Sequence, residues 1–188
     1  MEIYLIRHTT PAVEKGICYG QSDIPLADSF QNEAAKLLEY LPKDFDAIYS
    51  SPLSRCHILA ASIATNLKTD NRLCELNFGD WEMKKWDAIN QAELNHWMQD
   101  FVNVKVPNGE NLIELNHRVN HFADEMIKTD LSKVGVVTHA GVIRCFVSRI
   151  LEIPLKNVFK IPVDYSSVTK LHISSDGCNS NIEYLNKR

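Results

Sequence analysis

The chain has 188 residues, of which 45% are hydrophobic and 23% charged, and its formal net charge is -4 at pH 7. This length and composition suit one folded domain, which we predict over residues 1–188. The negative charge and the lack of a basic tract argue against nucleic acid as a partner. No apolar stretch approaches the ~20 residues of a membrane-spanning helix, and Glu2 and Arg7 interrupt any signal-peptide pattern. We therefore expect a cytoplasmic protein without membrane association.

Strand-like and helix-like stretches alternate along the chain. In chain order, the predicted elements are a strand at 3–6, a loop at 16–27, a helix at 29–41, a strand at 45–51, a helix at 52–67, an extended segment at 72–82, helical pieces at 84–101, a helix opening in 107–115, the most hydrophobic strand in 133–141, a helix at 142–151, and two strands at 167–174 and 181–185. This order predicts an α/β fold, with a mostly parallel sheet flanked by helices on both faces. In such sheets ligands bind outside the carboxyl ends of the strands, so we expect a site at that edge.

Short signals mark the expected ends of some elements. Ser51 is the expected N-cap of the helix at 52–67, which has a proline at its first position. Asn111 followed by Glu114 has the spacing of a capping box at the start of a later helix. Gly177 is the expected turn residue between the last two strands.

Polar residues follow three of the predicted strands. The first strand ends on Arg7 and His8, and the most hydrophobic strand leads to His139. The second strand ends on two serines, and Arg55 lies in the first turn of the helix that follows. Because the carboxyl ends of parallel strands meet at one sheet edge, we expect these histidines and arginines in one crevice, beside helix N-termini that attract anions.

This set of side chains suits a phosphoryl group. Guanidinium groups match phosphate oxygens, one neutral imidazole can attack phosphorus, and a second can donate hydrogen bonds in the transition state. A carboxylic acid is also needed to protonate the leaving oxygen, and Glu75 and Glu82 are the candidates in the extended segment. Each residue alone has an ordinary structural explanation, so the prediction depends on the joint pattern.

Metal and cofactor sites are not indicated. His117 and His121 are four residues apart on a predicted helix, but no third ligand lies near them in the sequence. The five cysteines include no CxxC pair, which argues against a zinc knuckle and a disulfide framework. We predict buried or partly buried thiols, no metal and no cofactor.

Ordered segments across nearly the whole chain resemble the histidine phosphatase superfamily, also called the phosphoglycerate mutase-like family. They are LIRHTTP, GQSDIPLA, YSSPLSRC, ELNFGDWE, VPNGENLIEL and VVTHAGVIR. The residues that depart from the family pattern are Thr9, Cys56, Asn108, Asn111 and Ala140.

The resemblance implies the three-layer, phosphoglycerate mutase-like sandwich and a metal-independent reaction. His8 would become phosphohistidine, and Arg7, Arg55 and His139 would form the phosphate pocket. Glu75 would be the proton donor and later the base for water.

Within the superfamily, RHTTP together with GICYGQSDIPLA is most similar to the α-ribazole phosphatases of cobalamin nucleotide-loop assembly. These remove phosphate from α-ribazole 5′-phosphate or the corresponding cobamide phosphate, so the partner implied is a small-molecule phosphomonoester. The similarity places Thr10, Tyr19, Gly20 and Gln21 at the substrate rim.

Alternatives stay open at this stage. Aromatic side chains could stack on a flat leaving group or pack in the core; these are Tyr19, Phe78, Trp81 and Trp86. A phosphoglycerate mutase or sugar phosphatase, a phosphoprotein phosphatase and a non-catalytic phospho-ligand binding module are the other functions considered. The chain is short for the mutases, which favours hydrolysis. The sequence leaves the oligomeric state open.

Overall fold

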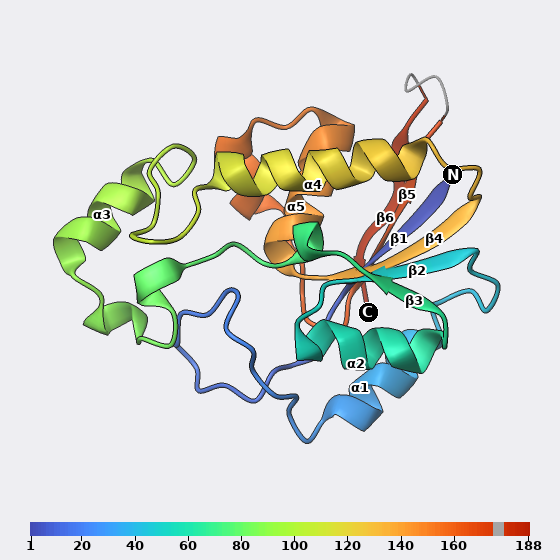
Figure 1. Ribbon diagram of the computed structural model, residues 1–188, viewed down its shortest axis with the longest axis horizontal. Helices are drawn as coiled ribbons and strands as arrows, with labels where there is room; N and C mark the ends of the chain where they lie inside the picture. The colour runs from blue at the N-terminus through green and yellow to red at the C-terminus, as the bar shows by residue number, and fades with distance from the viewer. Residues whose placement is uncertain (175–178) are drawn as a thin grey trace.

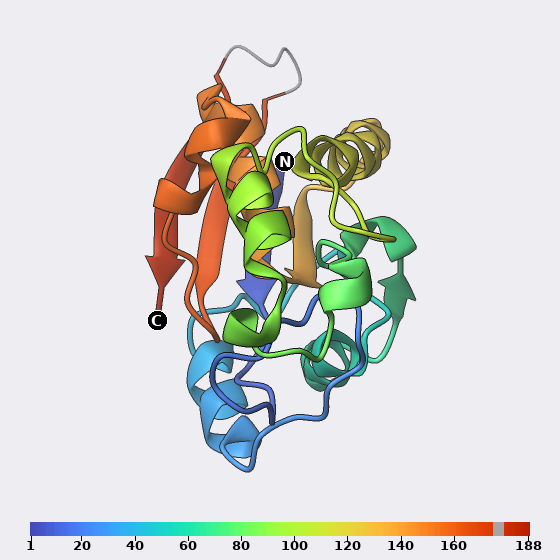
Figure 2. The ribbon, with the colours of Figure 1, turned by 90° about the vertical axis from the view of Figure 1, so that its left-hand side faces the viewer.

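The computed structural model describes residues 1–174 and 179–188, and a six-stranded sheet forms its centre (Figures 1 and 2). The strands are β1 Glu2–Arg7, β2 Ala47–Ser50, β3 Leu67–Thr69, β4 Lys133–Thr138, β5 Val168–His172 and β6 Asn181–Lys187. Their spatial order is β3-β2-β4-β1-β5-β6. The first four strands run parallel; beyond β1 the sheet continues with β5, which is antiparallel to β1, and then β6, which is antiparallel to β5. The predicted mostly parallel sheet is confirmed.

Helices cover both faces of this sheet, which gives the predicted three layers. The helices are α1 Phe30–Leu38, α2 Ser54–Ile63, α3 Gln91–Gln99, α4 Leu112–Ile127 and α5 Ala140–Leu151. In Figure 1, α4 and α5 lie on one face, and α1 and α2 on the other. Side chains alternate across a strand, so Ile3 and Leu5 of β1 join the core beneath α4 and α5, whereas Tyr4 and Ile6 join the core beneath α1 and α2.

An excursion over residues 71–111 connects β3 to α4. It contains α3 and short 3₁₀ turns, and it extends to the left of the sheet in Figure 1. A bridge between Ile17 and Lys85 joins it to the loop that follows β1. Two loops that are distant in sequence thereby stand together beside the sheet.

Some predicted element ends are wrong. Helix α2 begins at Ser54, not at 52, and Ser51 is not its N-cap. At this end of the helix, Asp23 provides the hydrogen-bond acceptor. Its carboxylate accepts from the Ser54 backbone N–H and from the Ser54 hydroxyl, both at 2.8 Å. The helix also ends at Ile63, and the predicted helical tail contributes the short strand β3, which pairs with β2.

Other predictions of local structure have clear outcomes. The capping box of Asn111 and Glu114 at the start of α4 is confirmed. The predicted turn residue Gly177 lies outside the described residues. In the described part of the chain, no helix has the length and apolar character to cross a membrane.

Candidate active site

The three strand ends predicted to carry the chemistry meet at one edge of the sheet. Arg7 pairs with Thr138 in the register of β1 and β4, and the next residue, His8, donates its backbone N–H to the Thr138 carbonyl at 3.1 Å. The imidazole rings of His8 and His139 lie edge to face, with centroids 5.1 Å apart. A cavity of about 220 Å³ opens beside them. Its polar lining residues are Arg7, His8, Tyr19, Glu75, His139 and Arg144.

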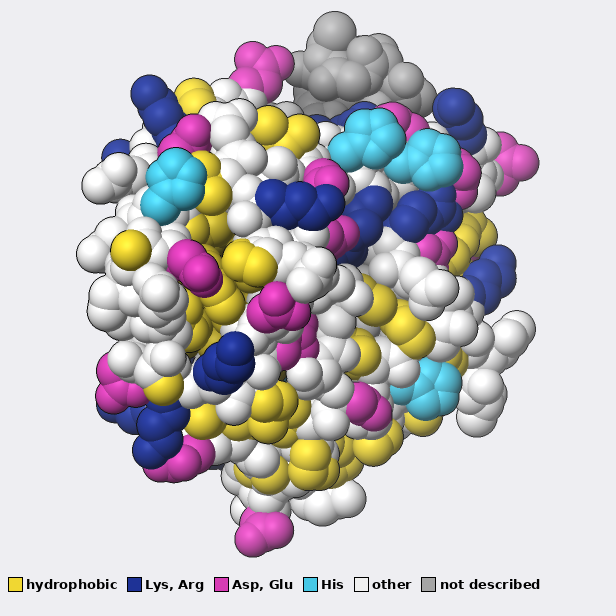
Figure 3. Space-filling model, turned by 60° about the vertical axis from the view of Figure 1, so that its left-hand side comes forward, with side chains coloured by type: hydrophobic (Ala, Val, Ile, Leu, Met, Phe, Trp, Pro, Cys, Tyr) yellow, Lys and Arg dark blue, Asp and Glu magenta, His cyan; other side chains and the backbone are white. Residues whose placement is uncertain are grey.

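The rest of the cavity wall is mainly apolar. Phe78, Trp86 and Phe159 contribute aromatic rings, whereas Trp81 is buried in the core at 3% exposure. Figure 3 shows the side of the molecule that bears α3, where hydrophobic side chains gather among charged ones. The cavity therefore has a polar end at the sheet and an apolar wall formed largely by the surrounding segments.

His8 is buried, and its ring is held by its neighbour. Nδ1 lies 2.7 Å from the Thr9 carbonyl oxygen, which can only accept, so Nδ1 carries the proton of the neutral ring. Burial, reinforced by the nearby charges of Arg55 and Arg7, lowers the pKa of His8 to about 3. His8 is thus neutral with an unprotonated Nε2, which is the form that can attack phosphorus.

His139 is fully buried at the N-terminus of α5. Its Nε2 lies 2.8 Å from the Ser51 hydroxyl. The same hydroxyl also accepts from the Leu53 backbone N–H at 3.4 Å, but α2 begins only at Ser54, so Ser51 lies outside the N-cap position. Burial, with His8 and the arginines nearby, lowers the pKa of His139 well below its ordinary value. A phosphate dianion placed between the two rings would favour the protonated form of His139, which can then donate a hydrogen bond to it.

The guanidinium of Arg7 is fixed from two sides. It donates to the Val163 carbonyl at 2.5 Å and lies 3.8 Å from the ring centroid of Tyr165. Its Nε is buried without a hydrogen-bond partner among residues 1–174 and 179–188. Because Arg7 lines the cavity, its guanidinium supplies positive charge there.

Arg55 is fully buried and lies behind the cavity lining rather than in it. It donates to the carbonyl oxygens of Gly20 at 2.5 Å and Ser22 at 2.8 Å, in the loop after β1. Its Nε also has no partner among the described residues. Arg55 thus organises the first loop and supplies positive charge next to His8.

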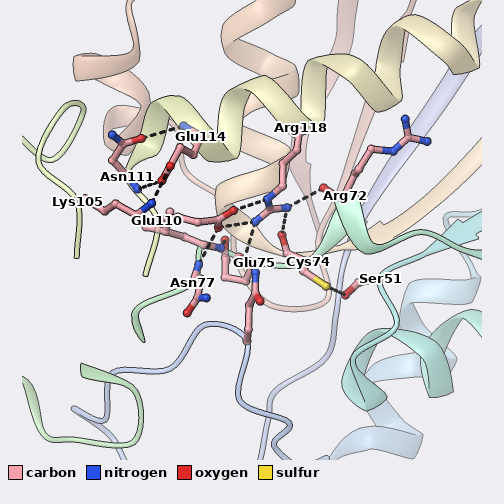
Figure 4. A network of polar contacts seen from close by, with 12 residues as sticks. Ser51, Arg72, Cys74, Glu75, Asn77, Lys105, Glu110, Asn111, Glu114 and Arg118 are labelled. Carbon is pink, nitrogen blue, oxygen red and sulfur yellow. Dashed lines mark hydrogen bonds and ion pairs between the residues drawn. The ribbon is translucent and has the colours of Figure 1, made fainter. Parts of the chain in front are cut away.

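Glu75 is the carboxylate in the cavity lining. It accepts hydrogen bonds from the Leu76 backbone N–H at 2.9 Å and from that of Gly141, in the first turn of α5, at 3.2 Å. Figure 4 shows how its backbone is fixed. Arg118 of α4 donates to the Glu75 carbonyl at 2.8 Å and pairs with Glu110 at 2.9 Å.

Glu82 has a different environment. Its carboxylate accepts from the backbone N–H groups of Gln21 at 2.7 Å, Ser22 at 2.5 Å and Phe78 at 3.1 Å, and from the Ser22 hydroxyl. Burial opposes ionisation, but these hydrogen bonds prevail and hold the pKa of Glu82 below its ordinary value. The geometry therefore favours Glu75 over Glu82 as the acid.

The four predicted rim residues separate into different positions. Only Tyr19 lines the cavity, where its hydroxyl is hydrogen-bonded to that of Tyr165. The Gly20 carbonyl accepts a hydrogen bond from Arg55, and the Gln21 side-chain amide donates one to the Glu75 carbonyl at 3.0 Å. Thr10 borders two neighbouring cavities.

Three residues of this site were not predicted from the sequence: Tyr165, Arg144 and Phe159. The Tyr165 ring lies 5.5 Å from that of His8, and the other two line the cavity. Tyr165 and Phe159 lie in segments without a motif. For Arg144, the available signal was a charged residue inside the apolar helical stretch VIRCFV.

No group of three His, Cys, Asp or Glu side chains in residues 1–174 and 179–188 could hold a metal ion. Cys18, Cys56, Cys74 and Cys145 are buried free thiols, and Cys178 lies outside the described residues.

Comparisons with known proteins identify the family and the fold of the chain. The sequence model of the histidine phosphatase superfamily (branch 1) matches residues 3–186. The Hydrogenobacter thermophilus protein named "Putative phosphoserine phosphatase 2" is 31% identical over 194 residues, covering 98% of this chain and 95% of that protein. The Escherichia coli O1:K1 protein named "Probable phosphoglycerate mutase GpmB" is 32% identical over 168 residues, covering 82% of this chain and 76% of that protein. The solved structure of the alpha-ribazole phosphatase from Shigella flexneri has the same fold, with a TM-score of 0.90 at 23% identity, covering 100% of this chain and 96% of that one.

Proposed function

Because the chain belongs to the histidine phosphatase superfamily (branch 1), we propose that it is a metal-independent phosphomonoesterase that acts through a phosphohistidine on His8. The observation that carries this proposal is the state of His8, a buried neutral imidazole with its proton on Nδ1. Arg7, Arg55 and His139 surround it with positive charge and hydrogen-bond donors. A neutral nucleophile beside such donors suits attack on a phosphate dianion.

The reaction has two steps. In the first, His8 Nε2 forms a bond to phosphorus, the ester P–O bond breaks, and Glu75 gives its proton to the leaving oxygen. In the second, Glu75 takes a proton from water, whose oxygen attacks phosphorus while the N–P bond breaks. The products are the alcohol and inorganic phosphate, and Glu75 regains its proton.

α-Ribazole 5′-phosphate is the first candidate substrate. The similarity of the first loop to α-ribazole phosphatases supports it, and the aromatic rings of Phe78, Trp86 and Phe159 in the cavity wall suit a flat base. Under this proposal the enzyme serves cobalamin nucleotide-loop assembly, in the cytoplasm.

Phosphoserine is the second candidate, and a specific observation favours it. The relative named as a phosphoserine phosphatase covers 98% of this chain at 31% identity. The two candidates have very different leaving groups, so one competition assay separates them.

The test is a phosphate-release assay in EDTA with α-ribazole 5′-phosphate, phosphoserine, 3-phosphoglycerate, fructose bisphosphate and a phosphotyrosine peptide. We expect turnover of a small-molecule phosphomonoester, and enzyme denatured at alkaline pH should carry a phosphate that is stable to alkali and released by acid. His8→Ala should abolish both signals while the thermal unfolding transition remains. Near wild-type activity in folded His8→Ala would remove the covalent mechanism, and robust isomerisation of 3-phosphoglycerate with bisphosphoglycerate would identify a mutase instead.

A further inference from the structure

Arg144 lines the cavity but has no part in the proposed phosphoryl transfer. Its Nε donates to the Ile161 carbonyl at 3.1 Å, and its guanidinium carbon lies 5.3 Å from the ring centroid of Phe159. Its two terminal nitrogens make no hydrogen bond or ion pair with residues 1–174 and 179–188. By contrast, Arg149 on the same helix pairs with Asp124 at 2.6 Å.

The position of Arg144 is tied to that of Glu75. The backbone N–H of Gly141 holds the Glu75 carboxylate at 3.2 Å, and Arg144 follows Gly141 by three residues on α5. Residues at this spacing are neighbours on a helix surface, and the Glu75 charge acts on the Arg144 guanidinium. The leaving oxygen receives its proton at Glu75, so atoms a few bonds beyond that oxygen come to lie near Arg144.

The surroundings of Arg144 strengthen its attraction for an anion. Leu115, Val158 and Phe159 line the cavity with it, and charges attract one another more strongly beside such apolar walls than in water. Burial lowers the pKa of Arg144, yet a guanidinium remains protonated in proteins. The charge of Glu75 opposes this fall, but among residues 1–174 and 179–188 no ion pair joins the two side chains. A half-buried guanidinium with free terminal nitrogens is unfavourable, and an anionic ligand group would relieve that cost.

We propose that Arg144 binds a carboxylate on the leaving group, so that the substrate is a phosphomonoester of a small hydroxy acid. The planar fork of a guanidinium matches two carboxylate oxygens, and the proposed mechanism already uses the positive charge of Arg7 and Arg55 for the phosphoryl group. The inference rests on the proposed function and makes it more specific. α-Ribazole 5′-phosphate has no carboxylate, so of the two candidates phosphoserine is the one that fits.

Substrate pairs that differ in the carboxylate test this directly. The first pair is O-phosphoserine and O-phosphoethanolamine, and the second is 3-phosphoglycerate and glycerol 3-phosphate. We expect wild-type kcat/KM to favour the carboxylate member of each pair by roughly tenfold to a hundredfold, the range for a hydrogen bond to a charged group. Arg144→Met should reduce this preference at least tenfold, Arg144→Lys should retain part of it, and the matched control Arg149→Met should leave it unchanged.

Binding to His8→Ala separates this inference from the proposed reaction. Calorimetry with the same pairs needs no turnover, and the carboxylate member should bind more tightly to His8→Ala than to His8→Ala with Arg144→Met. If turnover fails but this difference is found, the carboxylate site stands and the phosphatase proposal falls. The role of Arg144 would be overturned if the two members of each substrate pair had equal kcat/KM with the wild type, or equal affinity for His8→Ala. Neither measurement requires Arg144→Met to fold, and this outcome would leave the phosphatase proposal intact.

Discussion

The role proposed for Glu75 predicts a loss of activity that depends on the leaving group. Glu75→Gln keeps the shape of the side chain and one oxygen for the backbone N–H groups of Leu76 or Gly141. It removes the proton that must accompany the departing oxygen. A positioned general acid contributes roughly 10²–10⁴-fold, so we expect kcat/KM with alkyl phosphates to fall by about 10²-fold or more.

Kinetics with a series of substrates that differ in their leaving groups measure how the effect of Glu75→Gln depends on the leaving group. 4-Nitrophenolate needs little protonation, so Glu75→Gln should lose less than about tenfold with 4-nitrophenyl phosphate. With aryl and alkyl phosphates of rising leaving-group pKa, log(kcat/KM) should fall more steeply for Glu75→Gln than for wild type. A uniform loss across the series would refute proton transfer by Glu75, because a residue that only shapes the cavity affects all leaving groups alike.

Glu82→Gln is the matched control. One of its two oxygens would become an NH2 donor, which would face the backbone N–H groups of either Gln21 and Phe78 or Ser22, and each unsatisfied group costs roughly 1–3 kcal/mol. For a chain of this size, Tm should fall by about 2–4 °C per kcal/mol. Activity should fall evenly across the series, because the loop that holds Arg55 is loosened. A loss concentrated on poor leaving groups would instead assign the acid to Glu82.

Acidification should destabilise the protein through His8, whose pKa is about 3 when folded and near its ordinary value of 6.5 when unfolded. Between these two pH values the unfolded state binds more protons than the folded state. The contribution of neutral His8 to the free energy of unfolding is therefore full above pH 6.5, and it is lost as the pH falls toward 3, at up to about 1.4 kcal/mol per pH unit. Thermal unfolding at about pH 7.5 and about pH 4.5 should therefore show a smaller fall in Tm for His8→Leu than for wild type; equal falls would contradict the lowered pKa. Gly141→Ala would place a Cβ 2.2 Å from Glu75 Oε1. This should displace the carboxylate and lower kcat/KM with alkyl phosphates about tenfold, and unchanged kinetics would show that the acid acts from elsewhere.

The sheet and the centre of the site could be predicted because their patterns are local. β1 and β4 are apolar runs that end where polar residues begin, and parallel pairing alone brings His8 and His139 to one edge. The capping box of Asn111 and Glu114 is likewise a property of four consecutive residues. Features of this kind need no knowledge of the tertiary structure.

The features that were missed depend on contacts between distant segments. Ser51 has the right chemistry for an N-cap, but its hydroxyl is bonded to His139, and Asp23 from the first loop serves the helix end. The stacking of Tyr165 on Arg7 likewise joins segments far apart in the chain. A hydroxyl or a ring has several possible partners, and only the folded arrangement selects among them.

The residues proposed to transfer the phosphoryl group and those proposed to select the leaving group lie on different parts of the fold. His8 and His139 lie directly after strands of the sheet, whose backbone pairing holds the reacting groups in place. The proposed selection of the leaving group falls to Trp86, Phe159 and Arg144, which lie on the excursion, on the segment after α5 and on α5 itself. These side chains can change without disturbing the strand ends, so one reaction can serve many leaving groups. This is why a shared fold at 23% identity to an alpha-ribazole phosphatase does not decide the substrate, whereas the terminal nitrogens of Arg144, which have no partner in the described part of the chain, make a definite prediction about it.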